Sequence, residues 1–229
     1  MIPINSICLL TSGLFFSFIS FKVYFSYRKN NEGKIGNFFN SLLFLSLTFV
    51  LTSTPGIVFE DLSVIGYIFL VYPFFIFLAL AYFGIIPLQI LGWKKTEKAF
   101  FSGTIILGLV IALLNVAKMR PAVIHRVGKF VYWQDGRGVA MNVMIGATLS
   151  SAMLLLIAFF IIQGLKSSEK RIRNRAFIIA AGLFNLMVGS VINFIVGGSP
   201  NVYVASLVST FFFILAGVFL LVSTYYKPS

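Results

Sequence analysis

Seven long apolar stretches, separated by short polar segments, constrain this chain more than any other feature of its sequence. Each is close to the roughly 20 residues that a helix needs to cross the hydrocarbon core of a bilayer. A soluble domain could not bury this much apolar surface, because 59% of the 229 residues are hydrophobic and only 10% are charged. We therefore predict an all-α integral membrane protein, a single domain over residues 1–229. The seven transmembrane helices are expected at 4–27, 37–58, 64–92, 99–117, 139–165, 174–197 and 201–226.

The positions of lysine and arginine predict the orientation of these helices. Thirteen of the 18 basic residues fall on the side that the carboxyl terminus shares, which leaves five on the opposite side. Cytoplasmic loops carry the excess of basic residues in membrane proteins. The sequence therefore predicts an amino terminus outside and a carboxyl terminus in the cytoplasm. Because the positive charges fall in short clusters between apolar stretches, the net charge of +12 indicates membrane topology, and we expect no nucleic-acid partner.

The longest polar segment, residues 118–138, lies between the fourth and fifth helices. Its β-branched and aromatic residues, followed by the turn dipeptide Asp135-Gly136, favour a short hairpin over the outer mouth of the bundle. The alternative is an interfacial loop in which Tyr132 and Trp133 rest at the lipid headgroups.

Prolines interrupt two of the predicted helices. Pro73 and Pro87 lie inside the third, where each removes a backbone donor and should bend or break the helix. Pro55, followed by Gly56, should distort the outer end of the second helix. Such kinks serve either as packing features or in gating and ligand binding.

A weak internal similarity suggests a duplication. An offset of 137 residues places the first three helices on the last three, and in the inner loops Glu32, Ile35 and Asn37 then meet Glu169, Ile172 and Asn174. The halves would be residues 1–92 and 138–229, joined by helix 99–117, in a 3+1+3 parallel arrangement. The alternative is chance similarity, because so biased a composition produces many coincidental identities.

The residue inventory disfavours an enzyme and predicts no cofactor, catalytic residue or metal site. The one histidine, His125, lies in the outer loop, and the one cysteine, Cys8, lies in the first helix. Haem and zinc sites usually need several such ligands. The acidic residues all lie in predicted loops, whereas ion-coupled transport usually uses buried carboxylates.

Amides and hydroxyls are therefore the main polar groups inside the predicted bundle. Asn185 and Asn193 are eight residues apart and so lie near one face of the sixth helix. Together with Asn142 they could line a polar cavity. The alternative is a structural role, in which these amides form hydrogen bonds between helices.

The layout of the chain resembles that of a bacterial sensor family. A proline-bearing third helix ends in residues 81–88 (AYFGIIPL) before the basic pair Lys94-Lys95, and the seventh ends in residues 223–227 (STYYK). With seven spans and an outside amino terminus, this resembles the seven-helix sensor modules at the amino terminus of bacterial histidine kinases. The resemblance implies a sensor in a bacterial plasma membrane. It departs from the family because this sequence ends before a kinase domain could begin.

Two functions are consistent with these observations. The first is a receptor-like or accessory membrane module for signal transduction, which senses a small or lipidic ligand or binds a membrane or cytoplasmic protein, and communicates through its basic inner loops. The second is a passive small-molecule facilitator of the 3+1+3 type. The densest basic cluster could contact acidic partners or anionic lipid, or could only enforce topology. It consists of Lys166, Lys170, Arg171, Arg173 and Arg175.

Overall fold

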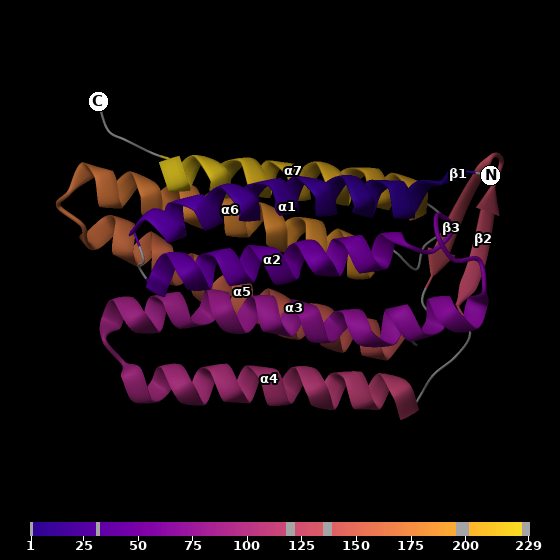
Figure 1. The fold of residues 1–229 in the computed structure, drawn as a ribbon, viewed down its shortest axis with the longest axis horizontal. Coiled ribbons are helices and arrows are strands. Elements are labelled where there is room, and N and C mark those ends of the chain that lie inside the picture. Colours follow the sequence, from indigo (N-terminus) through magenta and orange to yellow (C-terminus); the bar gives the residue numbers. More distant parts are fainter. Residues whose placement is uncertain (1, 31–32, 118–121, 135–138, 196–201, 226–229) are drawn as a thin grey trace. The chain divides into compact units, whose positions relative to one another are not determined.

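The computed structural model describes residues 2–30, 33–117, 122–134, 139–195 and 202–225 (Figure 1). Within these ranges it contains seven helices that are long and apolar enough to cross a membrane. The predicted all-α class of a multi-pass integral membrane protein is therefore confirmed at this level. The helices are α1 (Ile4–Asn30), α2 (Gly33–Ser53), α3 (Leu62–Leu91), α4 (Lys94–Ala117), α5 (Val139–Lys166), α6 (Lys170–Ile195) and α7 (Val202–Tyr225).

Several helices begin earlier than the apolar pattern predicts. α2, α4 and α6 start at Gly33, Lys94 and Lys170, so that basic residues expected in loops lie in the first turns of helices. The apolar pattern marks only the part of a helix that contacts hydrocarbon, and a helix continues beyond that part as long as its backbone bonds are satisfied.

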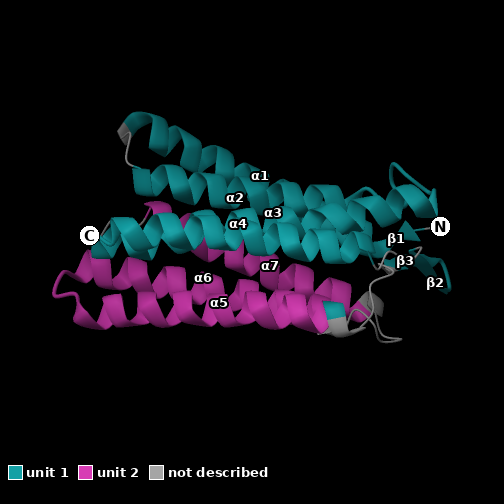
Figure 2. Cartoon of the chain, turned by 90° about the horizontal axis from the view of Figure 1, so that it is seen from below, with its two compact units in different colours: residues 1–141 teal, residues 142–229 magenta. Residues whose placement is uncertain are grey.

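The chain divides into two compact units, Met1–Met141 and Asn142–Ser229 (Figure 2). The first unit contains α1 to α4 and a small sheet, and the second contains α6, α7 and most of α5. The predicted single domain and the 3+1+3 repeat are not tested by this division, and both stay predictions.

In the first unit, consecutive helices pack side by side (Figure 1). Gly13 of α1 lies against Val50 of α2, where an added Cβ would come within 2.9 Å of Cγ2. Ser41 of α2 donates a hydrogen bond to the carbonyl oxygen of Ala79 in α3 at 2.9 Å. Small residues and interhelical hydrogen bonds hold helices together in lipid, where there is little hydrophobic drive for association.

The helices of the second unit also approach one another closely at glycines, where large side chains of the neighbouring helix pack. Gly182 and Gly189 of α6 lie against Leu220 and Phe213 of α7. α5 meets α6 in the same way, because Gly146 lies against Phe194 and Gly164 against Phe177.

The segment after α2 confirms the predicted effect of Pro55. α2 ends at Ser53 instead of continuing to residue 58, and Gly56 adopts a positive φ of 72°. Asp61 then caps α3, its side chain accepting a hydrogen bond from the backbone N–H of Ser63 at 2.7 Å. The turn between α2 and α3 is therefore fixed by local chemistry.

Neither Pro73 nor Pro87 breaks α3, which is one helix from Leu62 to Leu91, so of the two predicted effects breaking is wrong and bending stays a prediction. Both prolines are buried within it. The helix ends at Gly92, in the left-handed region at φ 73°, where the backbone N–H of Trp93 donates to the carbonyl of Leu88 at 3.0 Å.

A three-stranded sheet lies at one end of the first unit. It consists of β1 (Ile2–Pro3), β2 (Val123–Val127) and β3 (Phe130–Gln134), in the order β1-β3-β2. β2 and β3 form the predicted hairpin, with Val127 opposite Phe130. Its turn contains Gly128, at φ 61°, and not the expected Asp135-Gly136, which lies outside the described residues. Glycine reaches positive φ without the steric penalty that other residues incur.

The sheet is joined to the helices by specific contacts. The Nδ2 of Asn5 donates to the carbonyl of Trp133 at 2.9 Å, and the hydroxyl of Ser6 donates to the carbonyl of Pro55. Trp133 is only 6% exposed and its indole lies against Gly56. The interfacial-loop alternative is therefore wrong for Trp133, which packs inside the first unit.

We predict that Gly56→Ala lowers the free energy of unfolding by about 2 kcal/mol more than Gly92→Ala does. Both glycines have positive φ, so both variants strain the backbone. An added Cβ at Gly56 would also collide with Trp133 and come within 2.9 Å of Pro3 Cβ, whereas Gly92 faces open space. Thermal unfolding of the two variants in one detergent measures the difference, and equal losses would contradict the proposed collision.

Candidate functional site

A chain of hydrogen bonds joins three helices of the first unit. The Nδ2 of Asn37 in α2 donates to the Oε1 of Gln89 in α3 at 3.0 Å. The Nε2 of Gln89 donates to the Oε1 of Glu97 in α4 at 2.8 Å. Gln89 is thus the central residue of an amide–amide–carboxylate chain, and all three side chains are half-buried.

The turn between α3 and α4 explains how these residues meet. Only Gly92 and Trp93 separate the two helices, and the left-handed Gly92 reverses the chain direction. The backbone N–H of Glu97 donates to the carbonyl of Trp93 at 2.9 Å. The reversal brings the first turn of α4 beside the last turn of α3, so that Glu97 reaches Gln89. A carboxylate in the first turn also interacts favourably with the helix dipole.

The carboxylate sets the direction of the whole chain. The Oε1 of Glu97 accepts the hydrogen bond from Gln89, so the amide nitrogen of Gln89 faces it. The amide oxygen of Gln89 then faces Asn37, which must present its own nitrogen. Removing the central residue would leave a half-buried carboxylate and an amide without these bonds.

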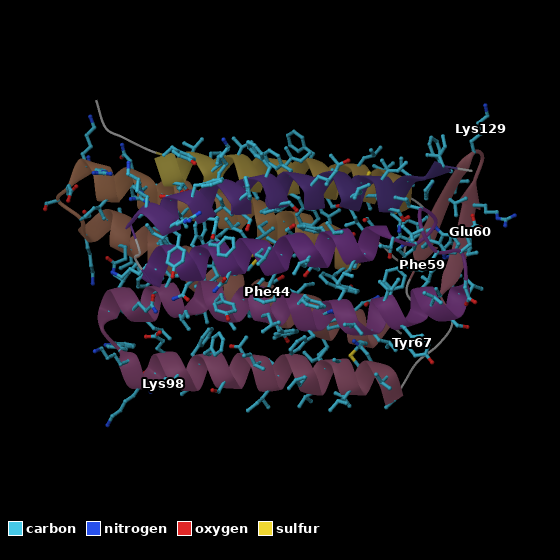
Figure 3. The ribbon with its side chains drawn as sticks, viewed as in Figure 1. Phe44, Phe59, Glu60, Tyr67, Lys98 and Lys129 are labelled. Carbon is cyan, nitrogen blue, oxygen red and sulfur yellow. The ribbon has the colours of Figure 1, made fainter. Side chains whose placement is uncertain are left out.

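Four exposed lysines lie at the same end of the first unit as these hydrogen bonds, at the starts of α2 and α4. We call this end the basic end and define it by Lys34, Lys94, Lys95 and Lys98. Lys34 is in the first turn of α2, and the other three are in the first turns of α4. Figure 3 shows Lys98 at this end, while Lys129 and Glu60 lie at the opposite end, near the sheet. Trp93, 56% exposed, lies beside the lysines, as is typical of a membrane–water interface.

The predicted basic cluster of the second unit divides into two kinds of residue. The Nε of Arg175 donates to the carbonyl oxygen of Ser223 at 2.9 Å, near the end of α7. Cations interact favourably with the carboxyl end of a helix, so Arg175 ties α6 to α7. The others are exposed, and we call them the α5–α6 cation group. They are Lys166 at the end of α5 and Lys170, Arg171 and Arg173 at the start of α6.

The three predicted cavity residues lie at three different levels of the second unit. Gly146 of α5 lies against Phe194 of α6. Because the two helices are antiparallel, Asn142, one turn before Gly146, lies about 7.5 Å along the helix axis from the level of Asn193. Asn185 lies about two turns before Asn193 in α6, is 9% exposed, and donates through Nδ2 to the carbonyl of Ala181 at 2.8 Å. The polar cavity itself stays a prediction.

Sequence reasoning missed the chain through Gln89. The apolar pattern places Gln89 inside the predicted helix 64–92 and Glu97 in the loop before helix 99–117, and it does not connect either residue with Asn37. A signal was nevertheless present, since a glutamine three residues before Gly92 and a glutamate five residues after it would face each other across a tight reversal.

No metal centre is found in the part of the chain that the structure describes, where no three His, Cys, Asp or Glu residues are grouped so that they could hold a metal ion. Comparison of the chain with protein-family models, with curated proteins and with solved structures gave no match. Functional inference therefore rests on the geometry of the chain's own residues.

We predict that Gln89→Leu lowers the free energy of unfolding by about 1.5–3 kcal/mol, because Glu97 and Asn37 each lose a hydrogen bond. Gln163→Leu is the matched control, since Gln163 is also half-buried near the end of a helix. Glu97→Gln should lose less than Gln89→Leu, because it retains an acceptor oxygen. Thermal unfolding in detergent measures all three variants. A loss of stability for Gln89→Leu no larger than that for Gln163→Leu would contradict a stabilising role for the hydrogen bonds through Gln89.

Proposed function

We propose that this chain is a receptor-like or accessory integral membrane module, which senses a ligand or binds a membrane partner and communicates through its basic inner surfaces. The observation that carries this proposal is the α5–α6 cation group. Lys170, Arg171 and Arg173 lie in the first turn of α6 and are exposed. The helix dipole disfavours cations at that position. Their positive charge therefore favours a negatively charged partner outside the chain.

Arg175 supports this distinction between structural and outward-facing cations. Its guanidinium binds the carbonyl of Ser223 and so stabilises the packing of α6 on α7. The preceding cations are thereby carried on an anchored helix rather than on a free loop. Because the helix is already ordered, a partner that binds these cations causes a smaller loss of conformational entropy than it would on a free loop.

The first unit supports a role in transmitting a response. At its sheet end, Trp133 contacts the α2–α3 turn at Gly56. At its basic end, Gln89 links α2, α3 and α4. A shift of α2 and α3 caused by a ligand at the sheet end would have to rearrange the chain at Gln89, because buried hydrogen bonds favour discrete arrangements over gradual ones.

We further propose that the amino terminus is outside and the carboxyl terminus in the cytoplasm of a bacterial plasma membrane. The excess of basic residues supports this orientation, since both the basic end of the first unit and the α5–α6 cation group fall on the proposed cytoplasmic side. The resemblance to seven-helix sensor modules supports both the membrane and the sensing role.

We predict that replacing Lys166, Lys170, Arg171 and Arg173 together by glutamine reduces retention of an acidic protein partner about tenfold or more, because charged pairs at interfaces contribute strongly. The measurement is quantitative mass spectrometry of the protein purified gently from its native membrane. The matched control removes the same number of charges from the same predicted side, through glutamine at Lys34, Lys94, Lys95 and Lys98. Purification of the chain alone, or with lipid only, would contradict binding of a protein partner.

A second candidate function is a passive small-molecule facilitator of the 3+1+3 type. The observation that favours it is the contact between Gly146 and Phe194, which joins the end of α5 that carries the half-buried Asn142 to the end of α6 that carries the half-buried Asn193. Amides spaced about 7.5 Å along the helix axes could hydrogen-bond a polar solute one after the other in passage.

For this second candidate we predict that replacing Asn142 and Asn193 by leucine abolishes solute flux into reconstituted vesicles while leaving the fold intact. Asn185→Leu is the control, because the amide of Asn185 already donates to its own helix at Ala181. Unchanged flux in the double variant would exclude these two residues from a transport pathway.

A further inference from the structure

A buried amide in α4 has no hydrogen-bond partner. Asn115 is 1% exposed, and neither its Nδ2 nor its Oδ1 is bonded to any other atom of the protein that the structure describes. A buried amide without partners is unfavourable by roughly 1–3 kcal/mol judged from protein variants, and native structures contain few of them. Asn115 therefore requires an explanation.

Asn115 lies on the face of α4 that packs against α3. The buried residues of α4 are Thr104, Gly108, Ile111 and Asn115, which recur every three or four residues and so share one face. An added Cβ at Gly108 would come within 2.7 Å of the Cβ of Phe77 in α3. The remaining faces of α4 are exposed, as Leu113 at 67% shows.

The facing stripe of α3 contains a backbone carbonyl that lacks its usual donor. Phe69, Pro73 and Phe77 are spaced four apart on α3 and all are buried. In a helix, the N–H of residue 73 would donate to the carbonyl of Phe69, but proline has no N–H. The carbonyl oxygen of Phe69 is therefore an acceptor without its regular intrahelical partner.

The antiparallel register brings this carbonyl to the level of Asn115. From Gly108 to Asn115 the rise along α4 is about 10.5 Å, and from Phe77 back to Leu70 the rise along α3 is the same. The carbonyl of Phe69 points along its helix toward Leu70. An amide without partners thus lies opposite a carbonyl without its donor, on the two faces that pack together.

We propose that Asn115 and the carbonyl of Phe69 form a binding site for one buried water molecule between α3 and α4. A water molecule needs two to four polar partners to be stable inside a protein, and this site offers three: the Nδ2 and Oδ1 of Asn115 and the oxygen of Phe69. The bound water satisfies the amide and also replaces the donor that Pro73 removes. It thereby lets a proline remain inside a continuous helix, as ordered waters do when they bond the free carbonyls of other membrane helices.

A double-mutant cycle tests this site, because Pro73→Ala restores the backbone N–H that would bond the carbonyl of Phe69. In the parent protein, Asn115→Leu should reduce the equilibrium constant for folding about fivefold or more, since the carbonyl loses its water. In the Pro73→Ala background the same substitution should change that constant less than twofold. Reversible unfolding in mixed detergent micelles measures all four proteins. Equal effects in both backgrounds, or a more stable Asn115→Leu protein, would overturn the proposal.

Asn185→Leu is the matched control for the cycle. Asn185 is also a buried helix amide, but it belongs to the second unit and donates to the carbonyl of Ala181. Its effect should therefore be the same with and without Pro73→Ala. A high-resolution structure in lipid nanodiscs gives an independent answer if a variant does not fold. Density for a water within hydrogen-bond distance of Asn115 and of the Phe69 oxygen supports the site, and a direct bond between Asn115 and that oxygen refutes it.

Discussion

In the hydrocarbon core of a bilayer a backbone N–H or carbonyl has no water to bind, so each must find a partner within the protein. The rest of this structure depends on that constraint. Helices satisfy it along their length, and their ends are completed locally: Asp61 binds the first amides of α3, and the left-handed Gly92 lets following amides bind its last carbonyls. Among the residues that the structure describes, the three strands lie at one end of the first unit, where β3 pairs with both β1 and β2. Pro73 and Pro87 are the points at which α3 departs from the rule, because neither has an N–H to donate.

Packing between helices follows from the same apolar surroundings. Because lipid is as apolar as the side chains, moving a leucine from lipid into a helix interface contributes little free energy. Close packing and hydrogen bonds therefore decide which helix faces meet. Glycines at Gly13 and Gly108 in the first unit, and at Gly182 in the second, let neighbouring helices approach closely. The stronger polar links are near the helix ends, where Gln89 bonds Glu97 and Arg175 bonds the carbonyl of Ser223. Charged groups are less costly there, because water and headgroups are near.

The sequence was informative about some candidate residues and misleading about others. It identified the α5–α6 cation group, but it did not separate Arg175, whose contact with Ser223 joins residues far apart in the chain. The sequence was also consistent with Trp133 at the lipid headgroups, whereas in the structure this residue is buried against Gly56. Composition alone cannot distinguish an aromatic ring at the membrane surface from one packed in the protein, since both environments suit an indole ring. Gln89 and Glu97 were likewise inconspicuous, because a glutamine near a helix end is ordinarily solvated.

The sequence by itself determined the number of helices, their approximate extent, the end of α2 before Pro55 and the hairpin between α4 and α5. These features depend on local patterns, since hydrophobic length, turn residues and alternation act over a few residues to a few turns. Tertiary structure alone decided that β1 joins the hairpin, that Asn37, Gln89 and Glu97 form one chain of hydrogen bonds, and that Asn115 is buried on the face of α4 that packs against α3. Such contacts depend on the register between packed helices. That register is set by which small residue on one helix packs against which large residue on the next, as Gly108 packs against Phe77. No single stretch of sequence contains this information.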